Sequence, residues 1–237
     1  MGDNGVTVRL VLTLVLAESS IELVPREIVK HPAVLNWARR KKKDPGQLIL
    51  DQTYHYPAMK KLGIDPQRGR PDISHLCLLA ALGSPLNLEG ELSCLVHTRD
   101  NKLVRVDPKT RLPRNTDRFV ALLEQLYEQG AVPKNGPHLL TLEQASLGRL
   151  VSALDSDSIV ALTTQGKSMP MHAVADELAR KRKPVLLVGG FSDGHFSKQA
   201  LGLAKEAYKI DRRGLDASTV VARAVYDYER ASGIGEA

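Results

Sequence analysis

The chain has 237 residues, of which 43% are apolar and 25% charged, and these proportions exclude a disordered or fibrous protein. Its 33 lysines and arginines outnumber its 27 acidic residues, and the net charge of +6 favours a polyanionic partner without specifying one. The length is typical of one elaborated domain, or of a core with an insertion.

The first apolar run, residues 6–17, is shorter than the about 20 residues that a membrane span needs, and it contains Arg9. No small-residue cleavage site follows a basic start, so we expect neither a membrane anchor nor a secretion signal. The two cysteines, Cys77 and Cys94, are too few for a zinc site or a disulfide framework. These features predict a cytoplasmic protein with buried thiols.

Short apolar or alternating runs bounded by turn residues predict strands at 6–17, 47–50, 92–97, 102–106, 159–162 and 184–188. Helical periodicity predicts helices at 25–30, 117–129, 141–154, 173–183, 197–209 and 217–231. Thr141 with Gln144 fits a capping box, and Asp100-Asn101 predicts a hairpin turn. From residue 141 onward, helices and strands alternate as they do in an α/β fold with a parallel sheet.

The middle of the chain differs from this alternation. Residues 88–118, rich in arginine, are interpreted as an antiparallel hairpin segment inserted into a single domain that spans 1–237. Arg111, Arg114 and Arg118 are three and four residues apart, so from the start of a helix they share a face. Guanidinium groups suit phosphates and base edges, which favours RNA binding over a merely solvated surface. Residues 39–43 form a second basic run, for which a solvated face is equally compatible.

Three segments are candidates for binding a ligand. The apolar run 184–188 opens into the glycine-rich sequence 189–194, the run 159–162 ends in Thr-Thr-Gln-Gly, and the segment 208–218 leads into the last helix. Glycine lets a backbone approach a ligand closely beyond the carboxyl end of a strand. The Gly-Gly-x-x-x-Gly spacing is not the dinucleotide fingerprint, so a tight turn without a ligand remains an alternative.

Other catalytic patterns are absent from the sequence. The seven histidines include no pair at a recognisable metal-ligand spacing, so we assign no metal. Ser192 is not in a nucleophile elbow. Asp72, two residues from Arg70, is interpreted as an ion-pair partner in preference to a catalytic base.

An ordered set of short motifs resembles one known family, the ribosome-biogenesis methyltransferases of the Nep/Emg type, which modify pseudouridine at N1 in small-subunit rRNA. The similarity covers nearly the whole chain, and the compact length is similar to that of the archaeal branch. The residues that carry it are Arg70-Pro-Asp72-Ile-Ser-His75, Leu78, Leu79, Ser84-Pro85-Leu86-Asn87, Gly90, His97-Thr98, Arg111-Leu-Pro113-Arg114, Phe119 and Gln125-Leu126.

This resemblance implies a SPOUT-type α/β fold with a mostly parallel sheet, a C-terminal trefoil knot and a homodimer. It implies S-adenosylmethionine as cofactor, converted to S-adenosylhomocysteine, and small-subunit rRNA as partner. The implied cofactor-binding residues are Leu162, Thr163, Gly189, Gly194, His195, Phe196, Ile210, Asp211, Arg212, Arg213, Gly214 and Leu215. Two departures from the family pattern are Gly190-Phe191, where Ala-Met is frequent, and Asp216, where serine is frequent.

The resemblance implies rRNA contacts by Arg70, Arg111, Arg114 and Arg118, and it places Arg70 and Asp72 at the catalytic site. In the favoured version Asp72 orients Arg70, and in the other it acts as a base. An alternative function is that of an rRNA-binding assembly factor whose main role is structural. A nucleotide-dependent metabolic enzyme is a third possibility, but it leaves the arginine-rich middle of the chain without a role.

Overall fold

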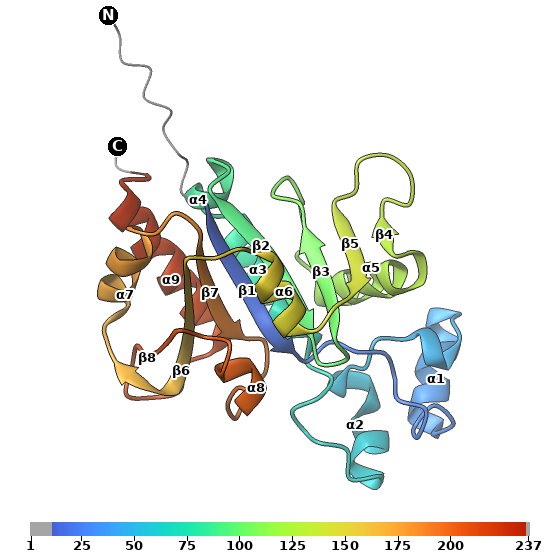
Figure 1. Cartoon of the computed structure of the whole chain (residues 1–237). Coiled ribbons are helices and arrows are strands. Elements are labelled where there is room, and N and C mark those ends of the chain that lie inside the picture. The colour runs from blue at the N-terminus through green and yellow to red at the C-terminus, as the bar shows by residue number, and fades with distance from the viewer. Residues whose placement is uncertain (1–10, 236–237) are drawn as a thin grey trace, which may run out of the picture.

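The computed structural model describes residues 11–235, which form one eight-stranded sheet flanked by helices (Figure 1). The strands are β1 (Leu12–Ser19), β2 (Leu92–Thr98), β3 (Lys102–Val106), β4 (Ala131–Val132), β5 (Leu140–Gln144), β6 (Ser158–Ser168), β7 (Pro184–Gly189) and β8 (Glu206–Lys209). The helices are α1 (Pro32–Lys41), the 3-10 helix η1 (Pro45–Gln47), α2 (Gln52–Lys61), α3 (Pro71–Leu82), α4 (Pro85–Leu88), α5 (Thr116–Gln129), α6 (Leu147–Ala153), α7 (Met171–Leu178), α8 (Lys198–Leu201) and α9 (Ala217–Ser232).

The strand β1 lies inside the sheet, whose order is β4-β5-β3-β2-β1-β7-β6-β8. It is parallel to both neighbours, and Leu14 pairs with Cys94 on one side and with Leu186 on the other. The strands β6, β7 and β8 are also parallel, whereas β3, β4 and β5 are antiparallel. The carboxyl ends of β1, β6, β7 and β8 therefore meet at one edge of the sheet, where α/β proteins bind ligands.

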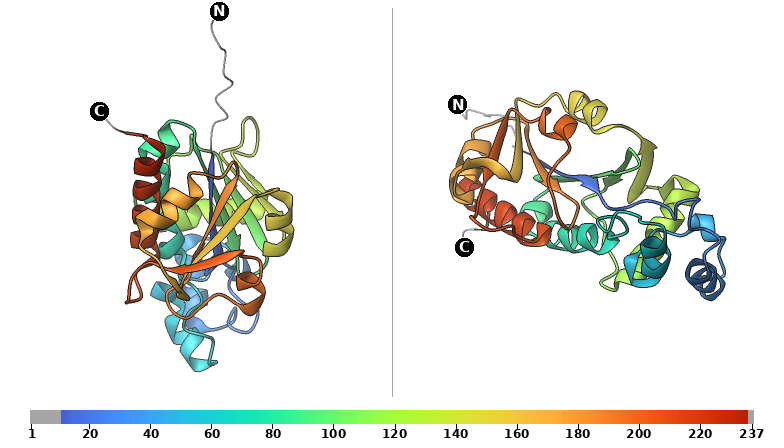
Figure 2. Two further views of the ribbon diagram at one scale, coloured as in Figure 1. Left: turned by 60° about the vertical axis from the view of Figure 1, so that its left-hand side comes forward. Right: turned by 90° about the horizontal axis from the view of Figure 1, so that it is seen from below.

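Helices cover both faces of the sheet (Figure 2). The helices α3, α5, α7 and α9 lie on one face and share a hydrophobic core with the sheet residues that point toward them. The shorter helices α6 and α8 lie on the other face, over a smaller core. Burial on both faces explains why β1 and β7 are nearly continuous apolar runs in the sequence, as is typical of parallel strands.

Residues 21–70 leave the sheet after β1 and form a separate helical unit with α1 and α2 (Figure 1). It has its own small apolar cluster, which includes Val34, Leu48 and Met59. The unit is fixed to α5 by an ion pair of 2.8 Å between Lys43 Nζ and the buried carboxylate of Glu124. Part of the basic run 39–43 is thus used in packing.

Several predicted elements are wrong. Residues 25–30 form turns instead of a helix, and residues 47–50 contribute one isolated bridge, at Ile49, instead of a strand. Residues 140–144 form β5 because Leu140 and Leu142 alternate and pair with β3, so no capping box exists there; the helix that follows is capped by Ser146. The predicted helix 197–209 divides into α8 and β8.

The other predicted strands and helices are present, although β6 continues to Ser168 and α7 ends at Leu178. The helices α1, α2, α3 and α4 and the short strand β4 were not predicted. The hairpin at Asp100-Asn101 is present, with Asn101 in the left-handed conformation. However, its strands β2 and β3 are built into the sheet instead of projecting from it as an insertion, because β2 pairs with β1 and β3 with β5. Residues 6–10 of the predicted first strand lie outside the described residues.

Candidate functional site

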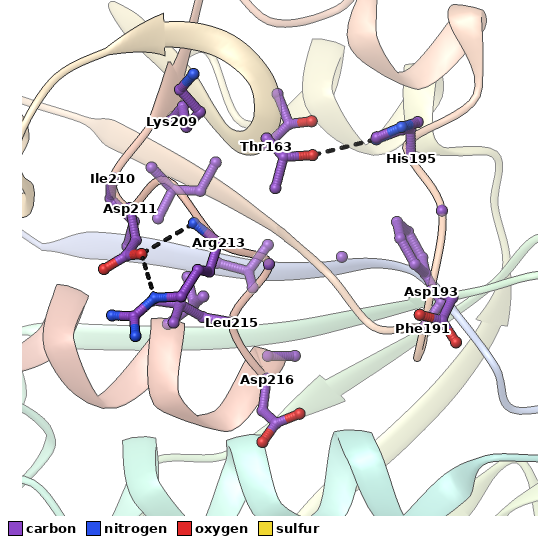
Figure 3. Close-up of a pocket in the computed structure, with 18 of the residues that line it drawn as sticks. Thr163, Phe191, Asp193, His195, Lys209, Ile210, Asp211, Arg213, Leu215 and Asp216 are labelled. Carbon is purple, nitrogen blue, oxygen red and sulfur yellow. Dashed lines mark hydrogen bonds and ion pairs between the residues drawn. The ribbon is translucent and has the colours of Figure 1, made fainter.

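A pocket of about 540 Å³ opens at the carboxyl ends of β7 and β8 and beside the middle of β6 (Figure 3). Its walls come from three segments within 162–164, 188–196 and 209–220, which are far apart in the sequence. The volume lies within the range of small-molecule sites. All the residues for which a cofactor role was predicted line this one pocket: Leu162, Thr163, Gly189, Gly194, His195, Phe196, Ile210, Asp211, Arg212, Arg213, Gly214 and Leu215.

The first wall is a bulge in β6. Leu162 and Lys167 both pair with Tyr208 of β8, so the residues between them are extra to the ladder. A side chain at Gly166 would begin 2.5 Å from the backbone of Ala207, which explains why a glycine closes the bulge. The bulge directs Thr163 and its neighbour Thr164 to the pocket.

The second wall is the loop that follows β7. Its start is fixed to the end of β1 by two backbone hydrogen bonds, from Gly190 N to Ala17 O and from Ser20 N to Gly190 O, both 2.9 Å. A Cβ atom at Gly190 would lie 2.1 Å from the Oγ of Ser19, so this approach requires glycine. Gly194 has φ +89°, which also favours glycine.

The third wall is the loop 209–217 between β8 and α9. Asp211 Oδ1 accepts hydrogen bonds from the backbone N–H and the Nε of Arg213, at 3.0 and 3.1 Å. The hydrogen bonds from Arg213 lower the pKa of Asp211 to about 2, so the carboxylate is charged at neutral pH. Figure 3 shows this pair on the opposite side of the pocket from Phe191 and Asp193. The pocket therefore has charged side chains on both sides, with an aromatic ring on one of them.

Arg70 and Asp72 form a bidentate pair at the start of α3. Arg70 Nε donates to Asp72 Oδ1 at 2.9 Å, and Arg70 Nη2 donates to Oδ2 at 2.8 Å. The hydrogen bond to Asp72 raises the pKa of Arg70, with a smaller contribution from Asp193 of the second wall. The pair is half-exposed, and it lies beside the residues 115–117 that begin α5.

Arg111, Arg114 and Arg118 are exposed, and in the described part of the chain their guanidinium groups have no hydrogen-bond or ion-pair partner. The segment that carries them is held by His75 of α3, whose Nε2 lies 2.7 Å from Pro113 O and whose ring stacks on Phe119. Arg111 and Arg114 line a groove of about 1080 Å³ next to α3 and α4, while Arg70 and Asp72 line a different hollow. The predicted RNA-contacting residues thus lie on adjoining segments instead of in one cavity.

Sequence reasoning did not assign several residues that line the pocket, among them Phe191, Asp193, Lys209, Asp216 and Val220. The first four lie within the segments that the glycine and strand patterns had marked, so those patterns located the loops but not each side chain. Val220 lies in the first turn of α9, where the apolar periodicity predicts only packing.

Within residues 11–235, no group of three or more His, Cys, Asp or Glu side chains is arranged to hold a metal ion. None of the helices in the same range has the length and apolar character that crossing a membrane requires. Cys77 and Cys94 are buried free thiols, as expected.

A mostly parallel sheet with a pocket of backbone loops at the carboxyl ends of its strands defines an α/β protein whose pocket has the size of a small-molecule site. The family model described as "EMG1/NEP1 methyltransferase" matches residues 14–229. The chain therefore belongs to the EMG1/NEP1 methyltransferase family, as the motifs predicted.

Two curated relatives bear the name "Ribosomal RNA small subunit methyltransferase Nep1". The protein of Thermococcus kodakarensis is 43% identical over 223 residues, which are 94% of this chain and 100% of the relative. The protein of Pyrobaculum aerophilum is 42% identical over 224 residues, which are 94% of this chain and 100% of the relative.

A solved structure, Archaeoglobus fulgidus Nep1 bound to S-adenosylhomocysteine, is 30% identical and superposes with a TM-score of 0.82. The match covers 93% of this chain and 98% of that one. It confirms the predicted α/β fold class.

Proposed function

We propose that this protein transfers a methyl group from S-adenosylmethionine to N1 of a pseudouridine in small-subunit rRNA. The observation that carries the proposal is the convergence of three separated loops on one pocket, at the strand ends where this fold binds ligands. The relatives that match nearly the whole chain are named as small-subunit rRNA methyltransferases, and one relative is bound to S-adenosylhomocysteine.

The pocket fits an adenosyl cofactor in size and in chemistry. Its volume of about 540 Å³ and its walls of glycine, threonine and backbone amides suit a ligand with a planar base and many polar atoms. Gly166 packs against the backbone of Ala207, and Gly190 packs against Ser19. A side chain at either glycine would displace a wall of the pocket and change the space for the ligand. We assign Leu162, Thr163, residues 189–196 and residues 210–215 to cofactor binding.

When bound, the cofactor supplies an electrophilic methyl group on a sulfonium, so the protein has chiefly to align the attacking base with it. Alignment of two reactants can contribute about 7–11 kcal/mol in favourable cases. We assign Arg70 to stabilising the pyrimidine as its N1 proton leaves, because a guanidinium favours developing negative charge. Asp72 acts on Arg70 by fixing its orientation through the bidentate pair.

We assign Arg111, Arg114 and Arg118 to rRNA binding, because they are exposed, cationic and not engaged by the described residues.

We further propose a homodimer, since α3 and α9 lie side by side and expose Leu76 and Tyr226, which are 51% and 66% accessible. From the family resemblance we also propose a C-terminal trefoil knot and a cytoplasmic location.

The proposal is tested in two steps. Calorimetric titration with S-adenosylmethionine and S-adenosylhomocysteine should give saturable binding, whereas ATP should give none. Transfer of a labelled methyl group should then occur to a small-subunit rRNA fragment that contains pseudouridine and not to the matched fragment that contains uridine. Equal methylation of both fragments would contradict the N1 assignment, and RNA binding without any cofactor binding would favour a structural assembly factor.

A further inference from the structure

Glu18, at the carboxyl end of β1, has a backbone conformation that its residue type rarely adopts. Its φ is +53°, in the left-handed region where a side chain is strained. Such strain persists only where the surrounding structure imposes it, and it gathers at functional sites. The residue is half-buried and does not itself line the pocket.

The strained backbone of Glu18 is held by a polar contact with the hairpin. Its N–H donates to Nδ1 of His97 at 3.3 Å, and Nε2 of His97 lies 3.3 Å from Asn101 Oδ1. Because Nδ1 accepts, the neutral ring carries its proton on Nε2 and donates it to Asn101. Burial lowers the pKa of His97, which favours this neutral form.

The strained conformation directs the side chain of Glu18 to the far end of the second pocket wall. Its Oε2 accepts a hydrogen bond of 2.9 Å from the backbone N–H of Ser197, a residue 179 positions away. The start of the same loop is hydrogen bonded to Ala17 and Ser20. The segment 17–20, at the carboxyl end of β1, thus fixes both ends of the loop 190–197, whose middle lines the pocket.

We propose that Glu18 is a positioning residue that holds the loop 190–197 in its cofactor-binding conformation. The inference rests on the proposed function and adds a residue outside the pocket. A hydrogen bond to a charged acceptor contributes more than one between neutral groups, so its loss should leave the loop end free to move. The cofactor would then have to order the loop on binding, which weakens binding.

The test compares three variants in the intact chain. Glu18→Gly removes the carboxylate and also relieves the backbone strain, so the protein should melt no lower than wild type while its S-adenosylhomocysteine Kd rises by about tenfold. Glu18→Gln keeps an acceptor oxygen and should restore most of the affinity. Asp155→Gly is the matched control, because Asp155 also has a positive φ (+47°) and an exposed ion pair, with Lys183, but lies at the amino end of β6, away from the pocket.

In the methylation assay, Glu18→Gly should raise KM for S-adenosylmethionine and leave kcat at saturation within about twofold of wild type. The inference is overturned if Glu18→Gly binds S-adenosylhomocysteine as tightly as wild type, or if its affinity and melting temperature fall together. It is also overturned if Asp155→Gly weakens binding to the same extent. Failure of wild type itself to bind S-adenosylhomocysteine would instead refute the proposed function, and this inference with it.

Discussion

The contact between Gly190 and the end of β1 makes a sharp prediction for the variant Gly190→Ala. The new Cβ would lie 2.1 Å from the Oγ, 2.7 Å from the Cβ and 2.8 Å from the Cα of Ser19. Ser19 cannot give way, because it is fully buried and its hydroxyl donates to Leu16 O at 3.0 Å. The loop after β7 must therefore move outward.

The size of the effect follows from what that movement breaks. Overpacking costs about 1–3 kcal/mol, and loss of one of the two hydrogen bonds between Gly190 and β1 adds about 1 kcal/mol. For a chain of this length, 1 kcal/mol lowers the melting temperature by about 2–4 °C. We expect a decrease of roughly 5–15 °C and at least a tenfold loss of affinity for S-adenosylhomocysteine.

The control is Gly148→Ala in α6, which does not line the pocket and where the nearest atom to the added Cβ is Leu203 Cδ2 at 3.9 Å, an ordinary contact. Thermal unfolding and calorimetric titration of both variants decide the matter. If Gly190→Ala melts and binds like Gly148→Ala, the close approach of the loop to β1 does not constrain the pocket, and the reasoning is refuted.

Three further predictions concern the polar residues. Asp72→Asn should weaken RNA binding by only roughly two- to fivefold, because the ion pair with Arg70 is more than one-third exposed. It should leave cofactor affinity unchanged. Unaltered RNA affinity together with unaltered methylation would contradict both roles considered for Asp72. Arg118→Ala should reduce the slope of log affinity against log salt by about one, in filter-binding titrations, and an unchanged slope would argue against a phosphate contact. Burial lowers the pKa of His55 to about 4, so between pH 7 and pH 5 the unfolded chain binds a proton that the folded chain does not. The free energy of unfolding, measured in urea, should therefore decrease by about 2 kcal/mol between these two pH values, and His55→Gln should abolish this decrease.

The sequence predicted best those parts of the fold whose signals are local. The strand β7 and the loop after it were located because an apolar run stops at consecutive glycines, and α9 because its periodicity is regular. The helix α3 was missed because it is buried on most sides, with Ile73, Cys77, Leu78 and Ala81 covered, so it has no clear polar face. The strand β5 was mistaken for a helix because its pairing with β3 overrides a local capping pattern.

The same distinction applies to the site. The family motifs selected residues that do line one pocket, yet no periodicity could show that 162–164 and 209–217 face each other. Glu18 was not identified because a single acid at the end of an apolar run carries no signal by itself. Its role depends on contacts with His97 and Ser197, which are distant in the chain.

The position of β1 in the sheet has a consequence for biosynthesis. The ribosome makes β1 before the other described strands, but its partner β7, paired through Leu14 and Leu186, follows roughly 170 residues later. At ordinary rates of translation, that interval lasts on the order of ten to thirty seconds. Throughout it, one edge of an apolar strand lacks its native neighbour, and such edges promote aggregation. Nascent chains arrested before residue 184 should therefore depend on chaperones far more than chains released after residue 189.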